Sequence, residues 1–324
     1  MQANVVEAIN NALFLEMEKD ESVVILGEDV GVNGGVFRAT EGLQKKFGER
    51  RVIDTPISEA GIIGASIGMA AYGLKPVAEI QFSGFSYLAL NQLISHASKL
   101  RTRSRGRFSA PLVVRSPYGA GVRALEHHSE SNESLFIHIP GLKVVIPSTP
   151  YDAKGLLISA MRDPDPVIFF EPMKLYRAFR EEIPEESYAI PISRANIVKQ
   201  GRDATIISWG SMMMQCRQAV NELNSEHIDT ELIDLRTLSP FDEETVLESV
   251  KKTGRAVIVH EAQKTLGFGA EISARINEKV MFYLKAPILR VTGYDVPVPY
   301  FKTEEQYVPS VEKIKNSVKK ILSY

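Results

Sequence analysis

The residue of this sequence best suited to acid–base chemistry is Glu59, which follows the segment Asp54-Thr55-Pro56-Ile57-Ser58. Pro56 and Ser58 are typical of a helix start, so Glu59 falls in the first turn of a helix predicted to run to Ala71. An acid there is ordinary, because a carboxylate interacts favourably with the positive end of the helix dipole. The alternative is a carboxylate buried at an interface, where it exchanges a proton with a bound group.

The same predicted helix contains several glycines. Gly61, Gly64 and Gly68 recur at spacings of three and four residues, so they share one face of the helix with Ala65. Each glycine inside a helix costs about 1 kcal/mol relative to alanine. The close approach of another backbone or of a flat ligand would offset this cost, so the face is a candidate packing surface.

Polar side chains come at the ends of apolar runs that read as buried strands. Glu28 follows the run 22–27, and Gln81 lies near the end of the run 75–82. In parallel sheets, ligands gather at the carboxyl ends of the strands, so Glu28 is a candidate pocket residue. The glycine-rich stretch 31–35 does not fit the G-x-G-x-x-G pattern of dinucleotide sites, and we interpret it as a turn.

Aromatic side chains and a histidine pair complete the candidate chemistry. Phe82, Phe85 and Tyr87 flank a predicted strand end, where they are either core residues or a stacking platform for a heteroaromatic ring. His127 and His128 are neighbours in a predicted loop, and no third metal ligand accompanies them. They are therefore either surface histidines or hydrogen-bonding groups of a site.

The bulk composition excludes several classes of protein. The 324 residues suit two domains, and the formal net charge of −2 gives no electrostatic reason to expect nucleic acid or an anionic membrane as a partner. The single cysteine, Cys216, excludes an internal disulfide and a cysteine-rich metal site. We expect a cytoplasmic protein, because this cysteine usage fits a reducing compartment and no secretory signal or apolar run of about 20 residues is seen.

Predicted strands and helices alternate along the whole chain, which is typical of an α/β fold with doubly wound parallel sheets. The boundaries that we predict are a first domain at residues 1–180, a charged linker at 181–197 and a second domain at 198–324. The predicted strands lie at residues 22–27, 51–53, 75–82, 111–115, 142–147, 166–171, 204–210, 230–235, 255–260 and 288–291.

These motifs, in this order, resemble the beta subunit of the thiamine diphosphate-dependent decarboxylating component of 2-oxo acid dehydrogenase complexes. The resemblance covers essentially the whole chain, and its most specific part is the segment Asp54 to Glu59. It implies a transketolase-like architecture with a pyrimidine-binding first domain. The other matching blocks are residues 27–35, 79–85, 128–129, 151–157 and 293–295.

The resemblance also implies roles for individual residues. The carboxylate of Glu59 would contact the aminopyrimidine ring of thiamine diphosphate, with Phe85 packed on that ring. The imidazole of His128 would position or protonate the reacting substrate, which makes Glu59 and His128 the expected catalytic residues. The expected cofactor-binding residues are Glu28, which would relay protons, together with Ile57, Glu59, Gln81 and Phe85.

A cation site is a further expectation. A predicted helix ends at Ala160-Met161, just before Asp163 and Asp165, and carbonyls beside two aspartates suit a hard cation. The alternative is a proline-rich turn with ordinary turn aspartates. The resemblance favours a structural potassium ion held by Leu112, Ala160, Met161, Asp163 and Asp165.

Partners follow from what the chain lacks. Thiamine enzymes hold the diphosphate through Mg²⁺ on a Gly-Asp-Gly stretch followed by asparagine, and this chain has no Gly-Asp-Gly. The resemblance therefore implies an alpha subunit that supplies this half, in an alpha2-beta2 heterotetramer. It also implies docking of the second domain, near Asp295 and Tyr324, on the subunit-binding and lipoyl domains of a dihydrolipoyl acyltransferase core.

The expected reaction is oxidative decarboxylation of a 2-oxo acid with transfer of the acyl group to a lipoyl domain. Pyruvate is the favoured substrate, while a branched-chain 2-oxo acid or acetoin stays open. Rival hypotheses are a stand-alone nucleotide-binding oxidoreductase and a scaffolding subunit without activity. The arginine-rich segment 101–107 is either a solvated loop or a landing patch for an acidic partner or an anionic substrate.

Overall fold

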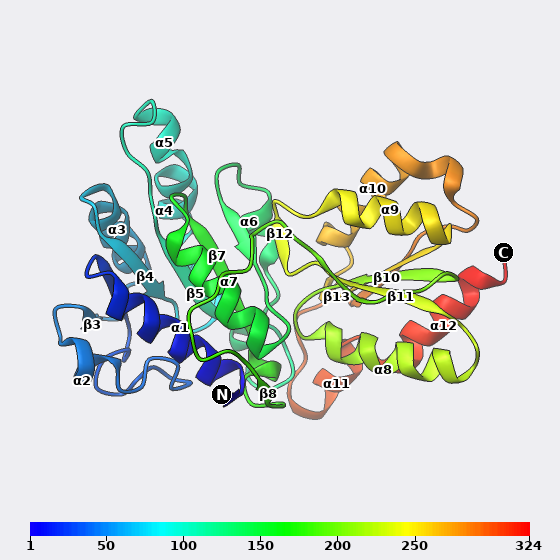
Figure 1. The fold of residues 1–324 in the computed structure, drawn as a ribbon, viewed down its shortest axis with the longest axis horizontal. Coiled ribbons are helices and arrows are strands. Elements are labelled where there is room, and N and C mark those ends of the chain that lie inside the picture. Colours follow the sequence, from blue (N-terminus) through cyan, green and yellow to red (C-terminus); the bar gives the residue numbers. More distant parts are fainter.

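The computed structural model describes all residues from 1 to 324, and Figure 1 shows two sheets, each covered by helices on both faces. The first sheet has seven strands in the order β12-β6-β7-β5-β4-β2-β3. All of its strands run parallel except β12, which pairs antiparallel with β6. The strands are β2 (Val23–Gly27), β3 (Val52–Asp54), β4 (Lys75–Glu79), β5 (Val113–Tyr118), β6 (Lys143–Val145), β7 (Val167–Pro172) and β12 (Thr237–Ser239).

Helices of the first unit lie on both faces of this sheet. On one face α1 packs against α7, and on the other α3 packs against α4. The sequence predicts a single helix after the aromatic residues 82–87 that runs to about Leu100, and this prediction is wrong. The segment is broken into two 3-10 turns and two short helices around His96. The helices are α1 (Val5–Lys19), α2 (Leu43–Phe47), α3 (Glu59–Ala71), η1 (Ser83–Ala89), α4 (Leu90–Ser95), η2 (Ala97–Lys99), α5 (Leu100–Arg103), η3 (Glu126–His128), α6 (Glu133–Ile137), α7 (Pro150–Arg162) and η4 (Met173–Leu175).

The second sheet has five strands in the order β14-β13-β10-β11-β9, of which only β9 runs antiparallel. Helices α8 and α12 cover one face, and α9 and α10 cover the other (Figure 1). The strands are β9 (Asn196–Lys199), β10 (Ala204–Ser208), β11 (Thr230–Asp234), β13 (Ala256–Gln263) and β14 (Leu289–Gly293). The helices are α8 (Met212–Ser225), α9 (Glu243–Thr253), α10 (Phe268–Val280), η5 (Met281–Tyr283), η6 (Phe301–Thr303), α11 (Glu304–Tyr307) and α12 (Val311–Leu322).

The prediction of an α/β fold with doubly wound, mainly parallel sheets is confirmed. Two features depart from it, because an antiparallel strand edges each sheet and β12 comes from the second half of the chain. A small sheet of β1 (Gln2–Ala3) and β8 (Glu181–Glu182) joins the N-terminus to the first two residues of the predicted linker. The domain boundaries themselves stay a prediction.

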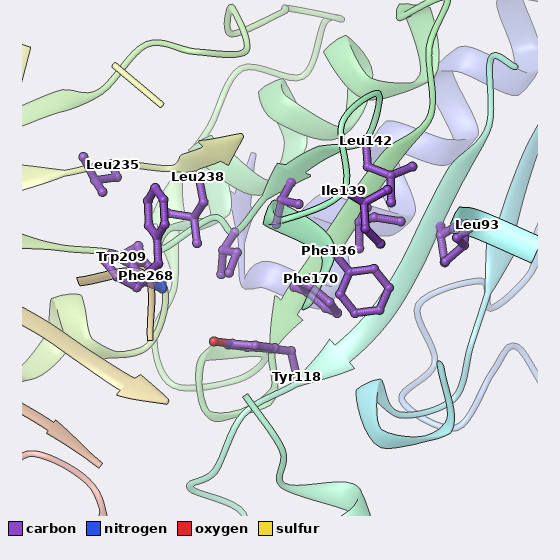
Figure 2. Packing of buried hydrophobic residues seen from close by; sticks show 14 of the residues in the cluster. Leu93, Tyr118, Phe136, Ile139, Leu142, Phe170, Trp209, Leu235, Leu238 and Phe268 are labelled. Carbon is purple, nitrogen blue, oxygen red and sulfur yellow. The ribbon is translucent and has the colours of Figure 1, made fainter. Parts of the chain in front are cut away.

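A continuous apolar core joins the two units. One cluster of 31 buried hydrophobic residues contains side chains from both sheets. Figure 2 shows Phe136 and Phe170 of the first unit in the same cluster as Trp209 and Phe268 of the second. None of the helices is both long and apolar enough to cross a lipid bilayer.

The first sheet also buries a network of charged side chains that was not predicted from the sequence. Arg115 on β5 bonds Glu79 Oε2 at 2.8 Å and Glu171 Oε1 at 2.6 Å, and Tyr176 donates to Glu171 at 2.6 Å. All are nearly inaccessible to solvent. Burial raises the pKa of Glu79, and the two acids outweigh burial to raise the pKa of Arg115. The cation thus neutralises two acids inside the sheet.

Candidate active site

Three of the candidate residues emerge at one edge of the first sheet. Glu28 follows β2, Glu59 begins α3 just after β3, and Gln81 follows β4. Because β2 lies between β3 and β4 and pairs in parallel with both, the carboxyl ends of these strands meet at the same edge. The structure therefore brings together the acids and the amide that the sequence singled out.

Glu59 is a buried acid, and its place at an interface stays a prediction. It is 6% exposed, and no lysine or arginine of the chain forms an ion pair with it. Helix α3 begins at this residue, although the Ser58 side chain does not cap it. Glu28 is equally buried, and its pKa is raised first by burial and then by the negative charges of Glu59 and Asp29. The negative charge of Glu59 thus disfavours ionisation of Glu28.

Asp54, the first residue of the motif, has a structural role that sequence reasoning missed. Its carboxylate accepts a hydrogen bond from Gly31 N at 2.6 Å. Gly34 and Gly35 adopt positive φ angles of 72° and 78°, and Gly35 N donates to Asp29 O at 2.7 Å. The stretch 31–35 is a turn, as predicted, and Asp54 fixes it beside Glu28.

Aromatic rings and an imidazole form one wall of the site. The ring centroid of His128 lies 4.2 Å from that of Phe82 and 5.3 Å from that of Phe85, and all three side chains are half-buried. His128 Nδ1 is buried without a hydrogen-bond partner. A Cβ at Gly84 would meet the backbone carbonyl of His127, so this glycine lets η1 approach the histidine loop rather than leaving room for a ligand.

Several candidate residues face outward. Ile57 is 82% exposed, and Tyr87 is exposed with its hydroxyl bonded to Glu130. The glycine face of α3 is also open, because no backbone approaches Gly64 and nothing lies within 4 Å of a Cβ built at Gly68. The chain therefore does not itself supply the close packing that the glycines predict.

The expected potassium ligands lie elsewhere. Leu112 precedes β5, while Asp163 and Asp165 precede β7, so these residues sit at the amino edge of the sheet, opposite Glu59. Lys143 Nζ bonds Asp163 Oδ1 at 2.7 Å, and Arg101 Nε bonds Asp165 Oδ1 at 2.7 Å. With both carboxylates already paired to cations, the side chains do not fit a potassium ion, and only main-chain carbonyls such as those of Ala160 and Met161 are left.

The same ion pair accounts for one residue of the arginine-rich segment. Arg101 is engaged by Asp165, while Arg105 and Arg107 are exposed. This agrees with a solvated loop, and a role as a landing patch stays a prediction.

The two residues expected at the docking surface are far apart. Asp295 accepts hydrogen bonds from Thr265 N and Oγ1, just beyond the carboxyl end of β13. The last helix ends at the other edge, where Arg255 donates to Ile321 O at 3.0 Å. The eight residues of β13 span roughly 26 Å. Asp295 and the exposed Tyr324 therefore do not belong to one small patch.

This arrangement has a defined chemical capability. A buried, unpaired carboxylate can accept a hydrogen bond from, or exchange a proton with, a ring nitrogen. The half-buried rings of Phe82 and Phe85 offer an apolar surface for a flat heterocycle. The half-buried imidazole of His128 lies beside these rings, and its buried Nδ1 has no hydrogen-bond partner in its own chain. The site thus fits a heteroaromatic ligand with a reactant beside it.

Comparison with known proteins places this site in a family context. Residues 1–178 match the family model described as transketolase, pyrimidine binding domain, and residues 193–314 match transketolase, C-terminal domain. A solved structure described as split gene transketolase, inactive beta4 tetramer, superposes with a TM-score of 0.81 at 20% identity, covering 99% of this chain and 98% of the other. The transketolase-like architecture expected from the sequence is confirmed.

Curated relatives match along the full chain. The pyruvate dehydrogenase E1 component subunit beta of Acholeplasma laidlawii is 55% identical over 315 residues, which cover 97% of this chain and 96% of that protein. The subunit of the same name from Bacillus subtilis is 49% identical over 323 residues, 100% and 99% of the two chains. That of Mycoplasma pneumoniae is 51% identical over 324 residues, 99% and 98% of the two chains.

Proposed function

The chain belongs to the pyruvate dehydrogenase E1 beta subunits, and from this premise we propose that it forms the pyrimidine-binding half of a thiamine diphosphate site that decarboxylates pyruvate. The observation that carries the proposal is the buried Glu59 carboxylate, which has no cationic partner in its own chain. Identity of 49–55% along the whole chain to subunits of one name favours pyruvate over branched-chain acids or acetoin.

The residues present fit the pyrimidine end of the cofactor. A buried acid without a partner, a half-buried aromatic wall and an orphaned imidazole nitrogen are the groups that such a ring and a neighbouring substrate would satisfy. The residues that would hold the ring are Glu28, Ile57, Glu59, Gln81 and Phe85. When bound, thiamine diphosphate supplies an electron sink for loss of carbon dioxide from a 2-oxo acid.

The chain's own side chains have three tasks in this proposal. Glu59 exchanges a proton with a ring nitrogen, and its burial keeps water from competing for that hydrogen bond. Glu28, with its raised pKa, is the neighbour able to hold a proton close to Glu59. His128 orients the substrate carbonyl and donates a hydrogen bond during acyl transfer to a lipoyl group, and such general acid help is worth about 10²- to 10⁴-fold.

The other half of the site is proposed to come from an alpha subunit in an alpha2-beta2 heterotetramer, which would hold Mg²⁺ and the diphosphate. The exposed Ile57, the open glycine face of α3 and Tyr72, which is 92% exposed, support a partner on this side.

Docking on a dihydrolipoyl acyltransferase core is proposed for the second domain. A structural potassium ion finds no support in the side chains, and a cytoplasmic location rests on the single buried cysteine.

The test is a decarboxylation assay with an artificial electron acceptor. The chain is co-expressed with its alpha partner, thiamine diphosphate and Mg²⁺ are added, and pyruvate, branched-chain 2-oxo acids and acetoin are compared. We expect turnover of pyruvate that requires both the partner and the cofactor. A well-formed heterotetramer with a strong preference for another substrate would overturn the choice of pyruvate, and no turnover at all would revive the scaffolding hypothesis.

A further inference from the structure

The loop that carries His128 is held from the second domain by a buried carboxylate. Ser131 Oγ donates to Glu261 Oε1 at 3.0 Å, and Ser211 Oγ donates to Glu261 Oε2 at 2.9 Å. Glu261 lies on β13 and is 3% exposed. One side chain therefore joins the end of the histidine loop to the start of α8.

The other end of the loop meets the same carboxylate. Gly119, directly after β5, has a φ of +85°, and a Cβ there would collide with Glu261 Oε1. Gly119 N donates to Glu130 O at 3.1 Å, so the loop closes on itself over the Glu261 side chain. Only glycine leaves the space that the carboxylate fills.

A second buried acid, Glu133, lies near enough to Glu261 to act on its charge. Tyr118 donates to Glu133 Oε2 at 2.5 Å, and Figure 2 shows the Tyr118 hydroxyl directed toward the side of the second domain. Burial raises the pKa of Glu261 to about 7, against the opposing effect of the two serine hydroxyls. Keeping an ionisable group in such a place is costly, whereas a hydrogen-bonded buried network fixes one geometry.

We propose that Glu261 is the positioning residue of His128: it clamps residues 119–131 against the second domain and thereby sets where the imidazole stands in the active site. Its catalytic part rests on the proposed function. The clamp is separate from the general joining of the two units, which the continuous apolar core already provides.

A second interdomain acid offers a matched control. Asp234 on β11 is fully buried, its pKa is raised to about 7 by burial and by Asp152, and it accepts a hydrogen bond from Ser148 of the first unit. Nearby, Arg236 Nη1 bonds Asp152 Oδ1 at 2.8 Å. This cluster joins the same two units without touching the histidine loop, so it separates positioning from cohesion.

The experiment uses the enzyme assembled with its alpha partner and carrying Glu261→Ala, Glu261→Gln or Asp234→Ala. Because a misplaced catalytic group costs one to two powers of ten, Glu261→Ala should lower kcat about tenfold with KM within about twofold, and Glu261→Gln should recover most of this. Hydrogen–deuterium exchange in residues 119–131 should rise in Glu261→Ala alone. Asp234→Ala should lower the melting temperature and leave kcat and that exchange unchanged.

A double-mutant cycle decides whether Glu261 acts through the imidazole. In a His128→Ala background, Glu261→Ala should cause no further loss of kcat. Additive losses, or equal losses in Asp234→Ala, would overturn the proposal, as would unchanged exchange in residues 119–131. If Glu261→Ala does not fold, Ser131→Ala should give the same pattern at about fivefold amplitude, since one hydrogen bond is worth about 1 kcal/mol. An unaffected Ser131→Ala would count against the clamp.

The exchange readout does not depend on the substrate. An assembled wild type that ignores pyruvate but protects residues 119–131 through Glu261 would contradict the proposed function alone. Full pyruvate turnover with a loop indifferent to Glu261 would contradict the positioning role alone.

Discussion

The first sheet buries acids in two ways. Glu79 and Glu171 share one guanidinium, that of Arg115, at 2.6–2.8 Å in the middle of the sheet. Glu28 and Glu59 lie at its carboxyl edge, as buried as Glu79, but with no cation between them. Buried glutamates are thus paired with a cation in the middle of the sheet and unpaired at its carboxyl edge.

The difference between the paired and the unpaired acids separates residues that stabilise the fold from residues that lower its stability. A buried acid paired to a buried base has a structural role, because removing either partner leaves a charge in a medium that cannot solvate it. Two neighbouring buried acids without a cation lower the stability of the fold, and a bound ligand or a proton would offset that cost. Mutations in the middle of the sheet and at its carboxyl edge should therefore have different effects.

The largest effect is expected in the middle of the sheet. Arg115→Met leaves Glu79 and Glu171 buried without a cation, and the expected loss of unfolding free energy is about 3–5 kcal/mol. Denaturant unfolding measures it. Replacing all three charged residues by apolar ones should restore most of the stability, and a single mutant as stable as the wild type would contradict the assignment.

A smaller change in free energy, with a larger chemical consequence, is expected at the edge. Glu59→Gln removes the proton-exchanging group, and decarboxylation should slow at least about 100-fold, or about 2.7 kcal/mol in the barrier. Unfolding free energy and assembly should stay close to those of the wild type. A decarboxylation rate that does not change would sink the role of Glu59.

The smallest effect concerns the pH dependence of stability. The raised pKa of Glu28 means that the folded state holds this proton more tightly than the unfolded state does. Stability that depends on Glu28 is therefore present below its ordinary pKa of about 4.3 and falls as pH rises through the folded value. Glu28→Gln has no such penalty, so its stability relative to the wild type should improve, by about 1 kcal/mol or less, between pH 4 and 8. Denaturation at a series of pH values measures the difference, and parallel curves would show that Glu28 stays ionised at no cost.

Much of the fold could be predicted because the deciding forces act locally. Apolar runs such as residues 22–27 and 204–210 are buried on both faces, and a helix follows each, so the parallel sheets were visible in the sequence. Glu28 was found because it comes directly after a strand, and Glu59 because helix-start residues precede it. The broken helix after residue 83 was missed, because its turns depend on contacts with the histidine loop.

The remaining features depend on residues far apart in the chain. Arg115 looked like the polar end of a strand, and only the sheet reveals that Glu79 and Glu171 stand beside it. Glu261 comes directly after the predicted strand 255–260, and its contacts with the histidine loop were not predicted, although a buried acid is itself a reason to search for a partner. Its partner Ser131 is 130 residues away, and no local pattern links the two.

Strand β12 has a consequence for how the protein is made. Val144 and Val145 of β6 are fully buried, and they pair with Ser239 and Thr237 across the end of the first sheet. While a ribosome is still synthesising the residues before 237, β6 is an unpaired apolar edge, the kind of surface that invites aggregation. The nascent first half must therefore wait for a strand encoded about 90 codons downstream, and chaperone demand should be greatest during that interval.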